Sequence, residues 1–506
     1  MAASPATATP RTAAQTCKCL IAGRWVESRT GRYADVWNPS TGDVIGRTPM
    51  CTAEDVNRAV EAAKRAFPAW RETPVVDRAR LMYRFRELLI QHTDEIARTV
   101  TREHGKTLAE SRASVQRGAE MVEFACSVPS LIGGEIVENL APNVDSETVR
   151  HPLGVVAGIT PFNFPAMVPL WMYPLAITCG NCFILKPSPR VPLSAIRVAE
   201  LLLEAGLPEG VFSLVHGDKE CVDALLSHPD IKAVSFVGST PVAKYIYATG
   251  AAHGKRVQAA GGAKNHLIIM PDADLDATVA GLAGSAFGCA GERCMAGSLA
   301  VTVGGIGDEV VRRLSETGSK MKVGRTDTGA DVDMGPLISR EHVERVAGYL
   351  DVAPQEGATV ALDGRKVRVA EAPNGFYLGP TIVDHVRPGT RAATEEIFGP
   401  LLSVTRVNSL EEALALGERC EFGNGASIFT RDGRAAREFK HRFNAGMIGI
   451  NIGVPAPMAW FPFTGWNRSF FGDLHIQGKE GLLFYTQQRM TMTRWFAPND
   501  PMWKPH

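Results

Sequence analysis

Apolar residues recur along this 506-residue chain in two alternating patterns, which predict helices and strands in turn. Residues 53–69 and 77–102 place apolar side chains every three or four positions, the spacing of an amphipathic helix. Short apolar runs at 154–159, 182–185 and 232–237 end in polar or glycine-containing turns and favour buried strands. This alternation predicts an α/β fold built on parallel strands.

Polar residues stand just beyond three of these strands. Asn163, Lys186 and Ser239 each follow the carboxyl end of a strand, where open parallel sheets bind their ligands. The usual GxGxxG fingerprint of dinucleotide sites is absent. The turn before Ser239 leads into a predicted helix, whose free N–H groups suit a pyrophosphate. Such a turn is also common as a plain connection, so from the pattern alone both readings stay open.

The charge balance excludes several classes of partner. Lys plus Arg and Asp plus Glu both total 54, and no basic run occurs, so we expect neither nucleic-acid nor membrane-surface binding. No stretch approaches the roughly 20 apolar residues of a membrane-spanning helix. Residues 1–19 are expected to form a disordered tail, with the front of an organellar transit peptide as the alternative.

Cysteine usage points to a reducing compartment and to one unusual thiol. Ten cysteines are too few for a disulfide scaffold, which predicts a cytoplasmic protein. Cys179 and Cys182 lack a second ligand pair, so no metal site is expected, while a redox role stays open. Cys294 follows small residues and adjoins Arg293, which favours an accessible thiolate. From spacing alone, a buried structural cysteine is equally consistent.

Six sequence blocks resemble, in order, those of the aldehyde dehydrogenase superfamily. The resemblance covers nearly the whole chain from about residue 20, and its blocks are 160–165 (TPFNFP), 185–188 (LKPS), 236–239 (FVGS), 288–294 (GCAGERC), 375–381 (GFYLGPT) and 395–400 (EEIFGP). It implies an aldehyde dehydrogenase-like fold with two doubly wound α/β domains and a small β segment. It also implies a nicotinamide-dependent oxidation of an aldehyde.

The same resemblance implies how the chain is divided. A nicotinamide-dinucleotide-binding domain would span 20–128 and 150–259, and a catalytic domain 260–445. An oligomerisation β segment would come from 129–149 and 470–497. In the family this segment joins subunits, which implies a homodimer or homotetramer.

The resemblance also assigns chemical roles. Cys294 would attack the aldehyde carbon, and the amide of Asn163 would stabilise the oxyanion. Lys186 would reach the adenosine ribose, Ser239 and the following helix the pyrophosphate, and Glu396 the nicotinamide ribose. Further cofactor contacts are implied for Thr160, Phe162, Ser188, Gly238 and Phe398.

One departure from the family narrows the reaction. Hydrolytic members carry a Glu before Leu-Gly-Gly, whereas residues 258–262 read QAAGG, with Ala259 in the place of that base. A thiol needs such a base less than water does. The chain accordingly resembles the coenzyme A-acylating branch, the methylmalonate- and malonate-semialdehyde dehydrogenases. The matching stretches are 117–125, 261–266, 293–296, 463–465 and 470–473.

In that branch, arginines matching Arg117 and Arg293 bind the substrate carboxylate, and Phe124 is expected beside them. A guanidinium fork suits this task because it can bond both oxygens. The alternative for Arg117 is a solvated helix face. The implied reaction oxidises malonate or methylmalonate semialdehyde with NAD through a Cys294 thioester, with decarboxylation and acyl transfer to coenzyme A.

Two substitutions keep alternatives open. Pro189 stands where many relatives place a Glu against the adenosine ribose, so NADP could replace NAD. Glu292 stands where relatives often have Gln and could replace the missing base. The enzyme would then be a hydrolytic NAD(P)-dependent semialdehyde dehydrogenase that releases a free acid, although a carboxylate beside the thiol would oppose thiolate formation. A non-catalytic binding protein would have lost the chemical positions, which are intact.

Overall fold

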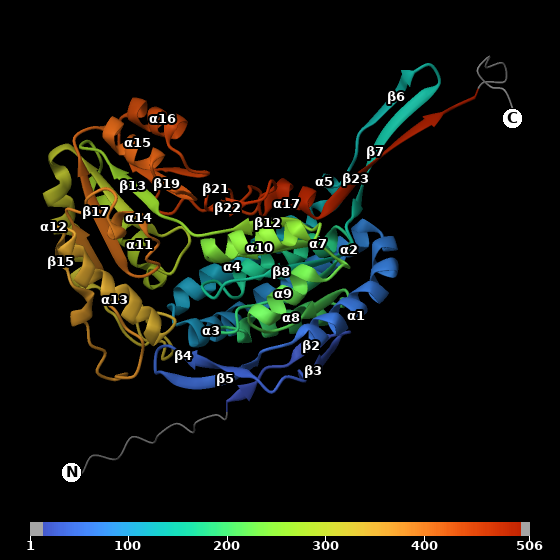
Figure 1. The fold of residues 1–506 in the computed structure, drawn as a ribbon, viewed down its shortest axis with the longest axis horizontal. Helices are drawn as coiled ribbons and strands as arrows, with labels where there is room; N and C mark the ends of the chain where they lie inside the picture. Colours follow the sequence, from blue (N-terminus) through green and yellow to red (C-terminus); the bar gives the residue numbers. More distant parts are fainter. Residues whose placement is uncertain (1–13, 497–506) are drawn as a thin grey trace, which may run out of the picture.

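Two large sheets organise the chain in the computed structural model, which describes residues 14–496. The seven-stranded sheet lies at the left of Figure 1 and the eight-stranded sheet near its centre, each flanked by helices. The predicted α/β fold with parallel strands is confirmed, because strands adjacent in each sheet are joined mainly by helical crossovers.

The eight-stranded sheet carries the strands predicted at 154–159, 182–185 and 232–237. Its five central strands run parallel, and the strands at both edges run antiparallel. In spatial order they are β22 (Phe470–Phe471), β12 (Arg256–Ala260), β11 (Ile231–Val237), β8 (Val155–Ile159), β9 (Cys182–Lys186), β10 (Phe212–Leu214), β2 (Cys19–Ile21) and β3 (Arg24–Val26).

The seven-stranded sheet is parallel except for one edge strand, β15. Its order is β15 (Thr359–Leu362), β16 (Thr381–Asp384), β17 (Leu401–Val407), β14 (Gly297–Val303), β13 (Asn265–Ile269), β19 (Gly425–Phe429) and β20 (Met447–Ile450). Small side structures are β4 (Tyr33–Asn38) with β5 (Asp43–Pro49), and β18 (Phe422–Gly423) with β21 (Trp466–Asn467).

The helices follow the predicted pattern with one difference. The single period expected over 77–102 is interrupted at His92, which ends one helix and precedes the next. The helices before residue 260 are α1 (Ala53–Glu72), α2 (Val75–Gln91), α3 (Thr93–His104), α4 (Leu108–Cys126), α5 (Val128–Leu131), α6 (Met167–Leu170), α7 (Tyr173–Thr178), α8 (Leu193–Glu204), α9 (Lys219–Ser227) and α10 (Thr240–Ala252). Those after it are α11 (Leu275–Phe287), α12 (Gly307–Lys320), α13 (Arg340–Gln355), α14 (Arg391–Thr394), α15 (Leu410–Glu418), α16 (Gly433–Arg442) and α17 (Gly478–Phe484).

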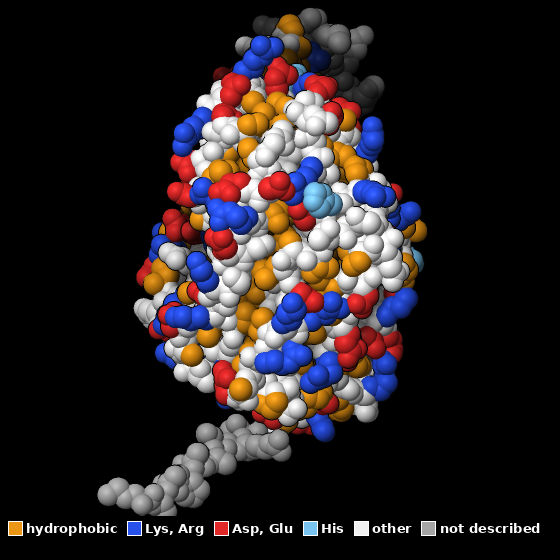
Figure 2. All heavy atoms as spheres, turned by 90° about the vertical axis from the view of Figure 1, so that its left-hand side faces the viewer, with side chains coloured by type: hydrophobic (Ala, Val, Ile, Leu, Met, Phe, Trp, Pro, Cys, Tyr) orange, Lys and Arg blue, Asp and Glu red, His pale blue; other side chains and the backbone are white. Residues whose placement is uncertain are grey.

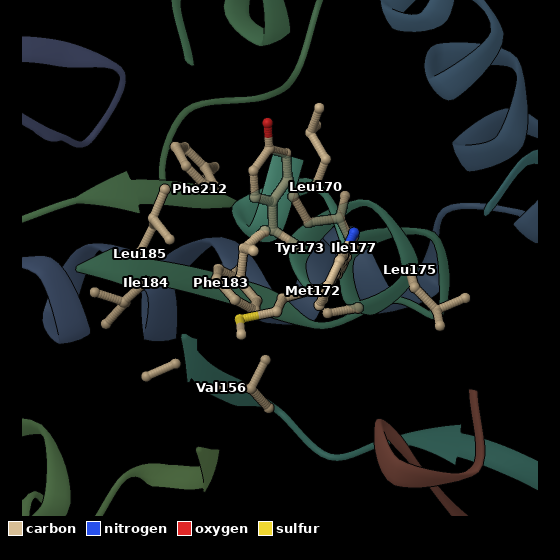
Figure 3. Close-up of a cluster of buried hydrophobic side chains, with 14 of the residues drawn as sticks. Val156, Leu170, Met172, Tyr173, Leu175, Ile177, Phe183, Ile184, Leu185 and Phe212 are labelled. Carbon is tan, nitrogen blue, oxygen red and sulfur yellow. The ribbon is translucent and has the colours of Figure 1, made fainter. Parts of the chain in front are cut away.

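An aromatic cluster fixes the central strands of the first sheet. The ring of Tyr173 on α7 lies 4.9 Å from that of Phe212 and 6.0 Å from that of Phe183, and all three side chains are buried (Figure 3). Close-packed rings of this kind resist displacement. They hold β9 against α7, so that the carboxyl end of β9 keeps a defined position.

A three-stranded antiparallel arm projects from the body at the upper right of Figure 1. It consists of β6 (Ile136–Ala141), β7 (Val144–Pro152) and β23 (Thr486–Arg494). Large apolar side chains are exposed on it, among them Ile136, Leu140, Met490, Met492 and Trp495. The predicted oligomerisation segment began at residue 470, whereas β22 pairs with β12 in the first sheet and the arm resumes only with β23.

The expected disordered tail over 1–19 is wrong for its last residues. Strand β1 (Gln15–Thr16) pairs with β5, and the thiols of Cys17 and Cys19 are buried. Burial of these apolar groups and the strand pairing hold this stretch on the body. Residues 1–13 of the expected tail lie outside the described residues.

The surface agrees with the zero net charge. Figure 2 shows positive and negative side chains interspersed on the face formed by the half of the molecule with the second sheet. Within residues 14–496, no helix is both long enough and apolar enough to cross a membrane. The same residues contain no group of three or more His, Cys, Asp or Glu placed to hold a metal ion.

Candidate active site

Two cavities meet at Cys294. The first, of about 570 Å³, lies at the carboxyl ends of β8, β9 and β11, and the second has about 500 Å³. Cys294 and Phe164 line both cavities, so the thiol stands in the wall that they share. A nucleophile in this wall can meet ligands from two sides.

The structure brings the predicted cofactor contacts together in the first cavity. Asn163 and Cys294 line it, and so do all eight predicted contacts, Thr160, Phe162, Lys186, Ser188, Gly238, Ser239, Glu396 and Phe398. These residues come from turns after three different strands and from the segment before β17. The parallel sheet gathers them because its strands all end at the same edge.

The loop that carries Cys294 is held on both sides. After α11 the chain makes a short 3₁₀ turn in which Cys289 and Ala290 have φ of 49° and 51°, followed by Gly291 at 71°. A Cβ atom on Gly291 would collide with the carbonyl oxygen of Gly399, so a glycine is required there. The loop therefore packs directly on the segment 395–400.

The backbone of Cys294 is fixed by two amides. Its carbonyl oxygen accepts hydrogen bonds from Nδ2 of Asn265 and Nδ2 of Asn424, each at 2.9 Å. Asn265 lies inside a block that resembles the family, but no pattern near Asn424 drew attention to it. Both residues fix the backbone of Cys294 without lining either cavity.

The thiol of Cys294 is protonated in the resting site. Burial, together with the smaller effect of the nearby Glu396 carboxyl, raises its pKa to about 12. Arg293 lowers this pKa, as the sequence suggested, but burial outweighs it. Glu396, rather than the Glu292 considered from the sequence, is the carboxylate whose charge opposes the thiolate.

Asn163 is anchored beside the Cys294 loop. Its Nδ2 donates to the main-chain carbonyl of Glu292 at 3.0 Å, and its own carbonyl accepts from Nζ of Lys106 at 2.6 Å. The Lys106 ammonium also lies 3.7 Å from the centre of the Phe164 ring. Lys106 is buried and was not singled out from the sequence, because it belongs to none of the matching blocks.

Glu396 is placed by the glycine turn after β12. Its Oε1 accepts from the amide of Ala263 at 2.9 Å. A Cβ atom on Gly262 would collide with Oε2 of this carboxylate, so a side chain there would displace Glu396 from its present position. Burial raises the pKa of Glu396 to about 7.

Helix α13 supports the segment that carries Glu396. Nε2 of His342 bonds the carbonyl oxygen of Phe398 at 2.6 Å, and Nη2 of Arg345 donates to that of Ile397 at 2.5 Å. His342 and Arg345 both line the first cavity and were missed from the sequence. Their spacing of three residues on one helix face was the only available signal.

Several polar groups in the first cavity are free for a ligand. The hydroxyl of Thr160 is buried and has no hydrogen-bond partner within residues 14–496. Ser239 precedes α10, and its side chain does not cap the helix. Lys186 also lines this cavity, but its Nζ already donates two of its three protons, to the carbonyls of Pro187 and Gly217, and burial lowers its pKa.

The second cavity holds both predicted arginines. Nη1 of Arg117 lies 2.9 Å from Oε2 of Glu120, and Nη2 of Arg293 lies 3.1 Å from Oε1 of Glu110. Phe124 does not line this cavity. Its side chain is buried and packs edge-on against another ring, that of Trp460.

The structure places no acidic side chain where hydrolytic members carry their base. Residues 259–262 carry no ionisable group, and Ala259 is buried within β12. The carboxyl of Glu292 lines neither cavity and lies instead beside the rings of His104 and His342. This placement does not favour Glu292 as a base that activates water at the thiol.

Comparison with known proteins decides the family. The profile of the aldehyde dehydrogenase family matches residues 25–491. The chain belongs to this family. Malonate-semialdehyde dehydrogenase 3 of Geobacillus kaustophilus is 52% identical over 485 residues, which cover 96% of this chain and 100% of that protein. Malonate-semialdehyde dehydrogenase of Pseudomonas aeruginosa is also 52% identical, with coverage of 94% and 96%.

Solved structures support the same assignment for this aldehyde dehydrogenase. Methylmalonate-semialdehyde dehydrogenase of Oceanimonas doudoroffii superposes with a TM-score of 0.94 at 51% identity, covering 96% of this chain and 99% of that chain. A Sinorhizobium meliloti structure complexed with NAD gives 0.95 at 44% identity, with coverage of 97% and 100%. The predicted aldehyde dehydrogenase-like fold is confirmed, and the chain is an enzyme that oxidises aldehydes.

Proposed function

We propose that this aldehyde dehydrogenase oxidises malonate or methylmalonate semialdehyde with NAD and transfers the acyl group to coenzyme A. The observation that carries the proposal is the position of Cys294 between two cavities. One is lined by the predicted cofactor contacts and the other by two arginines. The names of the most similar relatives support the substrate, and the NAD complex of a related structure supports the cofactor.

The first cavity has the groups that NAD needs. Lys186 would hold the adenosine ribose, the start of α10 at Ser239 the pyrophosphate, and Glu396 the nicotinamide ribose. The partnerless hydroxyl of Thr160 and the uncapped helix start fit a polar ligand there. Bound NAD supplies the hydride acceptor. Pro189, which stands where many relatives place a Glu against the adenosine ribose, lines the same cavity. Comparing activity with NAD and with NADP shows which of the two cofactors the enzyme uses.

The chemistry on the protein begins at Cys294. Its sulfur attacks the aldehyde carbon and forms a thiohemiacetal, and the amide of Asn163 donates to the new oxyanion. Because the pKa of the resting thiol is near 12, its proton passes to solvent water as the sulfur–carbon bond forms, rather than beforehand. Loss of hydride leaves a thioester on Cys294. The carboxylate of the substrate then leaves as carbon dioxide. The electrons of the broken carbon–carbon bond form a thioester enolate, which takes up a proton from solvent at its α-carbon.

Release of the acyl group is the step that requires coenzyme A. Water needs a base to attack a thioester efficiently, and residues 259–262 provide none. Malonate semialdehyde, NAD and coenzyme A should give acetyl-CoA in equal amount to NADH. Without coenzyme A we expect turnover to fall at least about 100-fold, the low end of what a positioned base contributes. The measurement is NADH absorbance together with product analysis, and coenzyme A-independent release of free acid would instead establish the hydrolytic reaction.

Arg117 should select for a carboxylated aldehyde. Removing it in Arg117→Ala deletes a charge-assisted hydrogen bond of about 1.5 kcal/mol at a half-exposed position, so kcat/KM for malonate semialdehyde should fall about tenfold. Propanal, which has no carboxylate, should be oxidised as before. Arg117→Lys keeps the positive charge but not the guanidinium fork. Its kcat/KM for malonate semialdehyde should lie between those of the wild type and Arg117→Ala. An equal loss of kcat/KM for both aldehydes would show that Arg117 supports the structure of the site and does not bind the substrate carboxylate.

We also propose that the arm of β6, β7 and β23 joins subunits into a homodimer or homotetramer in the cytoplasm. Its exposed apolar residues support this, because a patch of this kind usually marks a contact surface. Sedimentation of the purified chain distinguishes the two assemblies.

A further inference from the structure

Glu292 is a buried carboxyl group that the proposed reaction does not use. It precedes Cys294 by two residues, and its main-chain carbonyl accepts the Asn163 amide at 3.0 Å. Its side chain points to α13: Oε1 accepts from the amide of Ile338 at 3.2 Å and lies 3.4 Å from Nε2 of His342. The residue thus contacts the oxyanion donor with its backbone and α13 with its carboxyl.

The contacts continue from α13 to the cofactor side of the site. Nε2 of His342 bonds the carbonyl oxygen of Phe398 at 2.6 Å. Phe398 has φ of 56°, a conformation that a bulky residue adopts only when its surroundings impose it. Glu396 lies two residues before it in the same cavity wall. One series of contacts therefore joins the Cys294 loop to the proposed nicotinamide ribose contact.

The surroundings of this carboxyl do not support a negative charge. Within the described residues, Oε2 of Glu292 has no hydrogen-bond partner, and neither does either ring nitrogen of His104, whose Nε2 lies 3.8 Å from it. Burial lowers the pKa of His342 to about 4 and that of His104 well below its usual value, so both imidazoles are neutral.

Three cations face Glu292 from other elements, namely Lys106 after α3, Arg190 after β9 and Arg345 on α13. They lower its pKa, as does the Ile338 hydrogen bond, but burial outweighs all of them and raises the pKa to about 8. Oε2 lies too far from Nε2 of His104 for a hydrogen bond, so no donor within residues 14–496 stabilises a negative charge on it. A carboxylate would carry its charge in a buried place between two neutral imidazole rings, and the three cations offset only part of that cost.

We infer that Glu292 is a positioning residue that ties the catalytic loop to α13 as a neutral acid, and that loss of its proton weakens dinucleotide binding. At low pH the neutral carboxyl keeps its contacts with Ile338 and His342. As the pH rises and Glu292 ionises, we expect the buried charge to draw the carboxyl away from them. The inference rests on the proposed function, since it takes the first cavity as the NAD site. NAD binding requires neither aldehyde nor coenzyme A, so a failure of the proposed reaction leaves this inference separately testable.

The test is calorimetric titration of the full chain with NAD at about pH 7 and about pH 9, on either side of the pKa of Glu292. If only the neutral form binds well, the Kd of the wild type rises up to about tenfold, because about one molecule in ten stays neutral at the higher pH. In Glu292→Gln the ratio of the two Kd values should fall to about one, since an amide does not ionise there. Glu344→Gln, an exposed change on the same helix, should keep the wild-type ratio.

Two outcomes overturn the inference. The first is a Glu292→Gln protein that keeps the wild-type ratio, which would assign the pH dependence to another group. The second is a wild-type ratio near one, which needs no variant and so stands even if Glu292→Gln fails to fold.

Discussion

Replacing Cys294 with alanine is expected to lower the rate of NADH formation by at least about 10⁴-fold. Loss of a catalytic nucleophile elsewhere costs 10⁴- to 10⁶-fold, because the covalent route disappears and only binding and electrostatic effects remain. Among residues 14–496, only Cys294 and Phe164 line both cavities, and Phe164 carries no nucleophilic group. The measurement is NADH absorbance at saturating malonate semialdehyde, NAD and coenzyme A.

Cys420→Ala is the matched control for this variant. Cys420 and Cys294 are the only cysteines of the described chain that are not fully buried, and Cys420 lines neither of the two cavities. It should retain activity, and the Cys294→Ala protein should still bind NAD. Residual turnover above about one per cent of wild type in Cys294→Ala would point to a different nucleophile.

Asn163→Ala is expected to lower kcat by about 10²- to 10³-fold, or about 2.7–4 kcal/mol of transition-state stabilisation. That is the usual effect of removing one oxyanion donor. The amide already has its place beside the Cys294 loop, because Glu292 and Lys106 hold its side chain and backbone. A donor fixed before reaction stabilises the oxyanion without first having to reorganise.

Alkylation of Cys294 by iodoacetamide separates this role from damage to the loop. The alkylation reaction forms no oxyanion, so its rate in Asn163→Ala should stay within about threefold of the wild type while kcat falls. A parallel loss of both rates would mean that Asn163 merely supports the loop. The fall in kcat is compared with the 10²- to 10³-fold loss expected for removal of one oxyanion donor.

Much of this site could be predicted from the sequence because it depends on strand ends. Asn163, Lys186 and Ser239 were placed by three apolar runs, and a parallel sheet necessarily brings such positions to one edge. The resemblance to the family then favoured Cys294, which the spacing alone had left open, and added Glu396; both lie far along the chain. All five residues line the first cavity.

Other features depend on contacts that no local pattern encodes. Asn424 bonds the Cys294 carbonyl from 130 residues away, and Lys106 bonds the Asn163 carbonyl from 57 residues away. The sign of the Arg293 effect on the thiol was predictable, but the larger opposing effect of burial required the packed structure. Phe124 shows the converse error: its block matches the family, yet its ring is packed away from the cavity.

The absence of a side chain at Gly291 has an evolutionary consequence. Because the nucleophile loop rests directly on the backbone of Gly399, a change in the path of either segment displaces the other. Residues 288–294 and 395–400 should therefore drift as one unit when sequences diverge, with substitutions accepted in pairs or not at all. Grafting a foreign nucleophile loop into this enzyme would fail unless its partner segment were transferred with it.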